Sequence, residues 1–404
     1  MGSFISWMDF SEGQRRRVLD AVDVLRQEDV RDELGIGSVR DAFSDILFPG
    51  TGTVQTRARY FFFVPWIYRE LEEKGKDGAE IPRLARAAEI TLIEGLLSQG
   101  ERDGVIGIEA RQRLKRLPSN IYWLGLGTYG IRRFQGSQDA FHRYLRRPSI
   151  SFDEVITDDG EVLGGRRRLW DPALPAKPDG FPKEASFRLT REEATYLRER
   201  ILLSRPLAFL EFLVDAGEVW DPVDFPWEHP EVDRLRPNLK EQVQEAARFS
   251  NIFYGASVLY NLLLAEESKD SDREGTYREQ LEGWADEIRR AVAPPGPWPG
   301  DRFWEIARSE GANISPRTEG FVQAWARHAA GVASGAAPDA ESARRLISER
   351  EREVKGPKRA RLHDPSALAG WNGAAGLGRL DYRWRKAQRI VLDIIEGLRG
   401  RTHA

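Results

Sequence analysis

Cysteine is absent and histidine is scarce in this chain of 404 residues. Without cysteine the chain has no disulfides, no thiol catalysis and no cysteine-ligated zinc or iron–sulfur cluster. No two histidines stand three or four positions apart in the sequence: they are His142, His229, His328, His363 and His403. We therefore expect neither a metal site nor a cofactor.

Long apolar runs are also absent. No stretch approaches the ~20 apolar residues of a membrane-spanning helix, and the first residues, MGSFISWMDFSEGQ, lack a basic segment followed by an apolar one. We expect a bacterial cytoplasmic protein with no membrane partner. The formal net charge is only −3, so any basic binding surface has to be local.

Common catalytic motifs are missing too. The sequence has no G-x-S-x-G, no H-E-x-x-H, no calcium-binding loop and no Walker lysine. Asp153, Asp159 and Glu161 lie near a predicted hairpin, but Gly165 and Arg166 follow where a nuclease motif would carry its lysine. We therefore name no catalytic residue. The alternative is a hydrolytic, nuclease-like enzyme with a carboxylate site assembled from distant segments.

Helical periodicity is the dominant pattern in the sequence. Hydrophobic residues make up 41% of the chain and recur at helical spacing in most segments. An Asp-Gly turn between two short apolar runs predicts one small β-hairpin near residues 153–164. The predicted fold class is mainly α, multi-helix, with two subdomains and this hairpin. We expect an N-terminal helical domain over 1–150, a hairpin and proline-rich linker over 151–183, and a C-terminal helical domain over 184–404.

The stretch LFPGTGTVQTRARYFFFVPW joins a turn to an apolar block. Free N–H groups ahead of a helix suit an anion, so Gly52, Thr53, Arg57 and Arg59 form a candidate anion loop. The segment lacks the lysine of a nucleotide-binding P-loop.

A structural interpretation of the same stretch competes with the anion loop. In it, Thr53 caps a helix from about Val54 to Lys74, kinked at Pro65 and buried nearly all round. The two arginines then pair with carboxylates such as Asp41 or Asp45. We favour this structural interpretation.

Basic residues outnumber acidic ones by ten to four between Glu101 and Arg147. The spacing permits a helix-turn-helix-like region, with helices over Ile108–Arg116 and Ser119–Thr128. The second helix carries only Asn120 as a base-reading side chain, so we expect contact with the nucleic-acid backbone that is independent of sequence. The candidate contacts are Arg111, Arg113, Lys115, Arg116, Arg132 and Arg133, and pairing with acids elsewhere in the fold is the alternative.

A second basic stretch, KGPKRAR, has four basic residues and no acid. Lys355, Lys358, Arg359 and Arg361 could join the first region in contacting a nucleic-acid backbone. A solvated loop is the alternative interpretation.

Several longer stretches carry a family resemblance. RDELGIGSVRDAFSDILFPGTGTVQTRARYFFFVPWIYR, LPSNIYWLGLGTYGI, RFSNIFYGASVLYNLLLAE and GAAGLGRLDYRW resemble a bacterial family labelled only as a domain of unknown function. The resemblance spans nearly the whole chain and implies no activity or catalytic residues. It implies a loose association with phage-defence gene clusters, and hence other defence-system proteins as partners.

Three hypotheses follow from these patterns. The first is a non-enzymatic subunit of a phage-defence-type assembly that contacts nucleic-acid backbone or partner proteins through Arg/Lys clusters. The second is the hydrolytic enzyme, which a cleft with three or more acids would favour. The third is a protein-binding scaffold, which exposed Trp220, Trp227 and Trp298 would favour.

Overall fold

The computed structural model describes residues 32–74, 78–146, 155–156, 162–163, 169–291 and 298–400. Within these residues the chain is mainly helical, with fourteen α-helices and almost no strand, as predicted. No helix in the described ranges is long and apolar enough to cross a membrane. Arg147 and the acids Asp153, Asp159 and Glu161 lie outside the described residues.

Two compact units make up the chain, and each is built from two separate stretches. Unit 1 comprises Met1–Ile46 and Val232–Tyr382, and unit 2 comprises Leu47–Glu231 and Arg383–Ala404. The boundary expected at 151–183 lies inside unit 2, because the C-terminal helix returns to pack within that unit.

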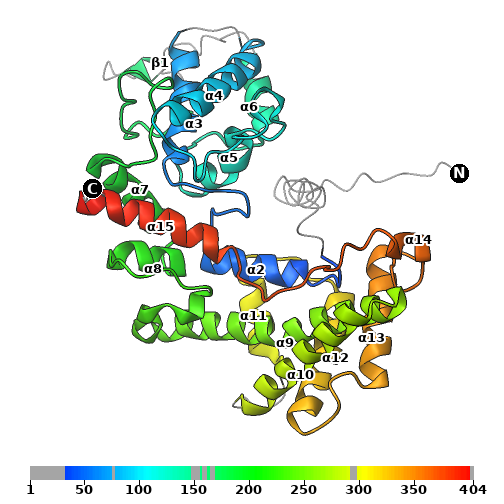
Figure 1. Cartoon of the computed structure of the whole chain (residues 1–404). Helices are drawn as coiled ribbons and strands as arrows, with labels where there is room; N and C mark the ends of the chain where they lie inside the picture. Colours follow the sequence, from blue (N-terminus) through cyan, green and yellow to red (C-terminus); the bar gives the residue numbers. More distant parts are fainter. Residues whose placement is uncertain are drawn as a thin grey trace, which may run out of the picture. The chain divides into compact units, whose positions relative to one another are not determined.

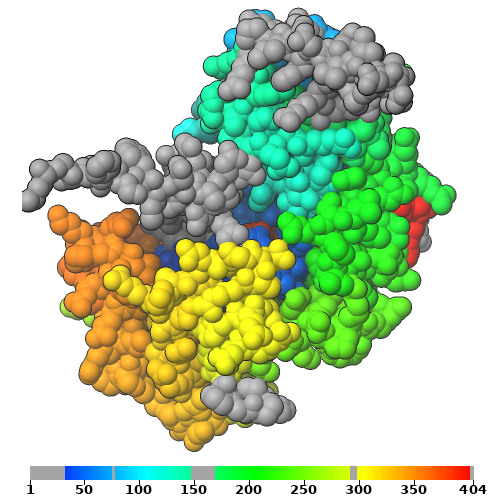
Figure 2. Space-filling model, turned by 180° about the vertical axis from the view of Figure 1, so that it is seen from behind, coloured from blue at the N-terminus to red at the C-terminus, as the bar shows by residue number. Residues whose placement is uncertain are grey.

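Unit 1 is an assembly of helices around one long helix, α9. Its elements are α2 (Gly37–Leu47, whose last residue belongs to unit 2), α9 (Pro237–Ser268), α10 (Ser271–Arg290), α11 (Asp301–Arg308), α12 (Pro316–Ala333), α13 (Glu341–Lys355) and α14 (Pro365–Leu368), with a 3-10 turn η3 (Pro230–Arg234) at the boundary between the units. Helices α10, α12 and α13 all pack against α9. In Figure 2 the yellow and orange segments of this unit, α11 to α13, lie side by side.

Two tryptophans fix the helices around α9. Trp284 of α10 and Trp325 of α12 stack with ring centroids 5.9 Å apart. Their indole N–H groups donate to the carbonyls of Asn251 and Ile252, each at 2.9 Å. Gly255 of α9 lets Trp284 approach, because a Cβ at that position would lie 2.2 Å from the indole. The apolar helix α9 therefore lies at the centre of its unit.

Unit 2 contains the remaining elements. They are α3 (Tyr60–Glu73), α4 (Ile81–Ser98), the 3-10 turn η1 (Arg111–Arg113), α5 (Pro118–Thr128), α6 (Gln138–Leu145), β1 (Val155–Ile156), β2 (Val162–Leu163), α7 (Arg191–Ser204), α8 (Phe209–Ala216), the 3-10 turn η2 (Pro226–Glu228) and α15 (Trp384–Arg399). Figure 1 shows α15 running beside α7 and α8, against which it packs. Strands β1 and β2 pair antiparallel over two residues each.

Helix α3 begins at Tyr60, so the prediction of a helix starting near Val54 is wrong. Side chains from other elements bind the backbone ahead of it. The Tyr122 hydroxyl accepts the N–H groups of Thr56 and Arg57, at 2.9 and 3.1 Å. These bonds satisfy the N–H donors without a helix. The helix itself is buried from Tyr60 to Tyr68, as its apolar sequence predicts.

The helix expected over Ile108–Arg116 is absent, so the helix-turn-helix prediction is wrong. Only the 3-10 turn η1 forms there, and Leu114 is extended, with φ −56° and ψ 119°. Gly107 adopts φ +86°, where a Cβ would lie 2.6 Å from the Leu114 side chain. The second predicted helix, α5, is present over Pro118–Thr128.

Candidate functional site

The predicted basic region of unit 2 centres on residues Arg111–Arg116, here called the cationic segment. Arg86 of α4 anchors it to that helix. The Arg86 Nη1 donates to the Leu114 carbonyl and its Nη2 to the Gln112 carbonyl, each at 2.8 Å. Arg86 thus holds, through two backbone carbonyls, a segment that has no regular helix of its own.

Charge along the cationic segment is only partly neutralised. Arg111 pairs with Glu94 of α4 at 2.8 Å, with both side chains about half exposed. Arg113 and Lys115 are exposed, and Arg116 is partly exposed. None of these last three makes an ion pair with another described residue. Three positive charges therefore face solvent within four residues.

The end of the cationic segment is fixed where α5 begins. Glu89 of α4 is buried and accepts the Ser119 N–H and the Ser119 hydroxyl, each at 2.8 Å. Burial raises the pKa of Glu89 to about 7, against the hydrogen bonds from Ser119 and the charge of Arg86, which lower it. Asn120 accepts the Leu117 N–H at 2.9 Å and donates to Gln138. The one base-reading side chain of α5 is therefore already engaged.

Two of the predicted contacts lie away from the free charges. Arg132 is buried, donates to the carbonyls of Trp123 and Gly136, and lies over the Trp123 ring with its Cζ 4.6 Å from the ring centroid. Arg133 pairs with Asp171 at 3.3 Å. Arg132 therefore has a structural role, and Arg133 is partly neutralised.

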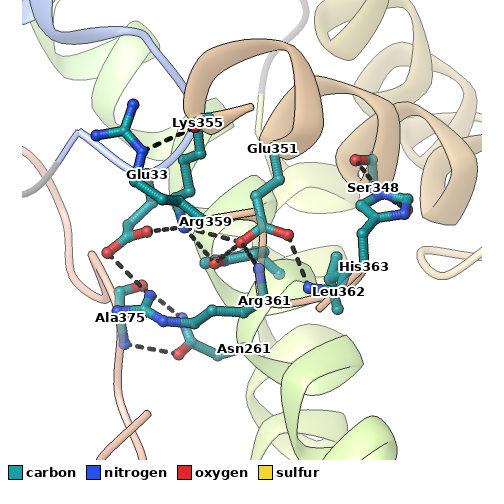
Figure 3. Close-up of polar contacts among 11 residues, drawn as sticks. Glu33, Asn261, Ser348, Glu351, Lys355, Arg359, Arg361, Leu362, His363 and Ala375 are labelled. Carbon is teal, nitrogen blue, oxygen red and sulfur yellow. Dashed lines mark hydrogen bonds and ion pairs between the residues drawn. The ribbon is translucent and has the colours of Figure 1, made fainter. Parts of the chain in front are cut away.

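Two of the four cations in the second basic stretch, Lys355 and Arg361 of unit 1, belong to a polar cluster (Figure 3). Lys355 pairs with Glu33 and, at 2.8 Å, with Glu351. Arg361 pairs with Glu33 at 3.1 Å. Both acids are buried, so the two cations serve as their counterions within the fold.

Glu351 is the centre of this cluster. It accepts the backbone N–H groups of Arg361 and Leu362, at 2.8 and 2.9 Å, and also binds Lys355 and the Tyr260 hydroxyl. Burial alone would raise the pKa of Glu351, but the hydrogen bonds from Lys355, Tyr260 and Leu362 hold it below its usual value. Glu351 therefore remains ionised.

Lys358 and Arg359 are the exposed members of the second stretch. The Arg359 Nε donates to the Lys355 carbonyl at 3.0 Å. Neither side chain makes an ion pair within the described ranges. This loop thus offers two solvent-facing charges where the sequence predicts four.

The candidate anion loop does not have the geometry that the sequence predicts for it. Thr53 is exposed and caps no helix, because α3 begins at Tyr60. The Gly52 carbonyl accepts the Gln55 N–H at 3.3 Å in a local turn. Gly52 and Thr53 therefore do not stand at a helix N-terminus.

Arg57 and Arg59 have carboxylate partners, as the structural interpretation expects, but not the two acids it names. Arg57 binds Asp393 of α15 through Nε and Nη2, each at 3.0 Å. Arg59 binds Glu193 of α7 at 2.8 Å. These partners lie far away in the sequence, so local spacing could not identify them.

Neither a metal-binding group nor a fully exposed loop tryptophan is found in the described part of the chain. It contains no group of three or more His, Cys, Asp or Glu side chains placed to hold a metal ion. Trp220 is buried, and its N–H donates to Gln388. The Trp298 N–H donates to Glu245, and Trp227 stacks on Phe225. None of these tryptophans is fully exposed.

Arg86 and Glu89 were missed as residues that position the basic site. Each is one charged residue in an amphipathic helix, which is a common and uninformative pattern. Their three-residue spacing on α4 offers the one local signal, since it places both side chains on the same helix face.

Comparisons with known proteins give a family and nothing more specific. No curated protein and no solved structure matches the chain. A family model matches residues 2–397, which confirms the whole-chain resemblance, and the chain belongs to the family of unknown function DUF6361.

Proposed function

We propose that this protein binds the phosphate backbone of nucleic acid, independently of sequence, through its cationic segment. In this proposal it is a non-enzymatic subunit of a bacterial, phage-defence-type assembly. The observation that carries the binding role is the group Arg113, Lys115 and Arg116, whose side chains are exposed or partly exposed and make no ion pair with any described residue. The defence setting rests on the family resemblance alone.

Anchoring of the segment supports the proposal. Arg86 and Glu94 of α4 hold its backbone and its first side chain in place. A preordered cationic segment loses less conformational entropy when it binds than a free loop does. Clustered Arg and Lys side chains that need only neutralise phosphates give affinity without sequence preference.

Backbone contact fits this segment better than base reading does. The helix that follows it has Asn120 as its polar candidate, and Asn120 is bonded to Leu117 and Gln138. Direct reading of a base needs a free side chain that can reach the base edge. The proposal therefore predicts similar affinity for unrelated sequences.

Paired double variants in the full-length protein test this proposal. The Arg113→Ala/Lys115→Ala variant removes two exposed charges from the cationic segment. The Lys358→Ala/Arg359→Ala variant removes the same charge from the loop of unit 1. Fluorescence anisotropy with labelled double-stranded DNA measures the affinity of each.

We expect the first pair to weaken binding about tenfold or more, since each lost phosphate contact removes counterion release. We expect the second pair to have the smaller effect. Equal loss in both variants would show that net charge, and not the cationic segment, determines binding. Loss confined to the second pair would place the contact in unit 1 and contradict the proposal.

A further inference from the structure

A second cationic feature of unit 2 is a cavity of about 340 Å³ at the start of α7. Its walls come from three parts of the unit: Arg59 before α3, residues 186–191 leading into α7, and the last turn of α15. Figure 1 shows the end of α15 beside α7. The volume is at the lower end of the ~300–1,000 Å³ range of small-molecule sites.

Three of the lining residues are arginines. Arg59 is more than nine-tenths buried and is held by the Ser186 carbonyl at 2.9 Å and by Glu193 at 2.8 Å. Arg188 and Arg191 are exposed and make no ion pair with any described residue. Because Glu193 pairs with Arg59, the other two positive charges of the lining are those of Arg188 and Arg191.

The N-terminus of α7 adds donors to this cavity. Thr190 and Glu193 form a capping box, with bonds of 2.9 and 3.1 Å. These bonds use the N–H groups of Thr190 and Glu193. The N–H groups of Arg191 and Glu192, at the first two helical positions, have no acceptor within the helix. Such groups and the helix dipole favour an anion.

We propose that this cavity binds a phosphomonoester dianion, supplied by a free nucleotide or by the 5′-phosphorylated end of a nucleic acid. Two guanidinium groups with free N–H donors match the two charges and several oxygens of that group. Among the described residues that line the cavity, Glu396 is the only acid. The inference goes beyond the proposed function, because it uses no residue of the cationic segment.

Isothermal titration of the full-length protein with inorganic phosphate and with AMP tests the site. The Arg188→Ala/Arg191→Ala variant removes the free charges without touching a buried contact. The Arg143→Ala/Arg146→Ala variant is its matched control, since it removes two exposed arginines elsewhere in unit 2.

We expect AMP to bind the unmodified protein, and the Arg188/Arg191 variant to bind it about tenfold or more weakly. The control should bind as the unmodified protein does. Absence of phosphate and AMP binding at millimolar concentration would overturn the inference. Equal weakening in the Arg143/Arg146 control would also overturn it.

A second pair of probes distinguishes a nucleic-acid end from a free nucleotide as the source of the phosphate group. A single-stranded oligonucleotide is compared with and without its 5′ phosphate. Preference for the phosphorylated form that disappears in Arg188→Ala/Arg191→Ala supports a nucleic-acid end as the ligand. Competition by AMP without such a preference supports a free nucleotide. Both results are independent of the variants at Arg113 and Lys115, so this inference and the proposed function can fail separately.

Discussion

At the scale of one residue, the end of the cationic segment is held by the buried carboxyl group of Glu89. Its carboxylate is almost completely removed from solvent and binds only the N–H and hydroxyl of Ser119 among the described residues. Burial raises its pKa from the ordinary 4.5 to about 7. Between these two values the folded protein keeps a proton that the unfolded chain releases, so stability falls as the pH rises.

The first prediction is that Glu89→Gln removes this pH dependence. Glutamine stays neutral and still accepts the Ser119 N–H. The unmodified protein should lose roughly 3 kcal/mol of unfolding free energy relative to the variant between pH 4.5 and pH 7. Urea denaturation of both proteins at pH 5 and pH 8 measures the difference. The same difference between the two proteins at both pH values would argue against a raised pKa at Glu89.

The second prediction concerns Arg57 and Asp393. Asp393 is buried, binds Arg57 through two nitrogens and also accepts the Ala58 N–H at 2.9 Å. Removing Arg57 leaves the buried Asp393 with Arg389, 2.8 Å away and partly exposed, as its counterion, and removing Asp393 deprives both arginines of theirs. We expect Arg57→Ala and Asp393→Ala each to lower the unfolding free energy by about 3–5 kcal/mol.

A double-mutant cycle distinguishes this structural role from anion binding by Arg57. The double variant should lose clearly less stability than the two single losses together, because the pair acts as a unit. Chemical denaturation of the four proteins supplies the values. If Arg57→Ala kept full stability and lost a binding activity, the anion-loop interpretation would be correct instead.

At the scale of elements, close packing of α9 against α10 depends on a missing side chain. A Cβ on Gly255 would lie 2.2 Å from the Trp284 ring, whereas one on Gly275 of α10 would meet nothing within 4 Å. The third prediction is that Gly255→Ala costs about 1–3 kcal/mol, as overpacked cores do. Gly275→Ala should stabilise the protein by up to about 1 kcal/mol, since alanine favours a helix.

Thermal denaturation of the two alanine variants checks this opposite response. Both variants add one methyl group to a helix, so propensity alone would move both melting temperatures upward. A higher melting temperature for Gly255→Ala would mean that α10 shifts away from α9 at little cost.

Helices were predictable where local chemistry determines them. The capping box of Thr190 and Glu193 marks the start of α7, and the Ser137 hydroxyl accepts the Ala140 N–H at the start of α6. The helix expected over Ile108–Arg116 does not form, because contacts from α4 determine the backbone conformation there. Arg86 binds its carbonyls, and no local pattern reports such a contact.

At the scale of the whole molecule, local composition identifies the basic stretches but not which of their side chains form ion pairs. Lys355 and Arg361 are neutralised by Glu33, which is distant in the sequence. Arg113 and Lys115 lie in a similarly basic stretch and make no ion pair with any residue that the structure describes. The pairing of a surface charge depends on tertiary contacts, which the order of residues along one segment does not contain. For the same reason the sequence around Arg188 and Arg191 does not indicate the cavity that they line.

The salt dependence of DNA binding tests the central claim most directly. For duplex DNA, each phosphate contact contributes about −0.9 to the slope of log affinity against log salt concentration. Anisotropy titrations across a salt series should give a steep negative slope for the full-length protein. The slope for the Arg113→Ala/Lys115→Ala/Arg116→Ala variant should be less negative by about 2–3. An unchanged slope in the variant, or no binding at low salt, would contradict the account.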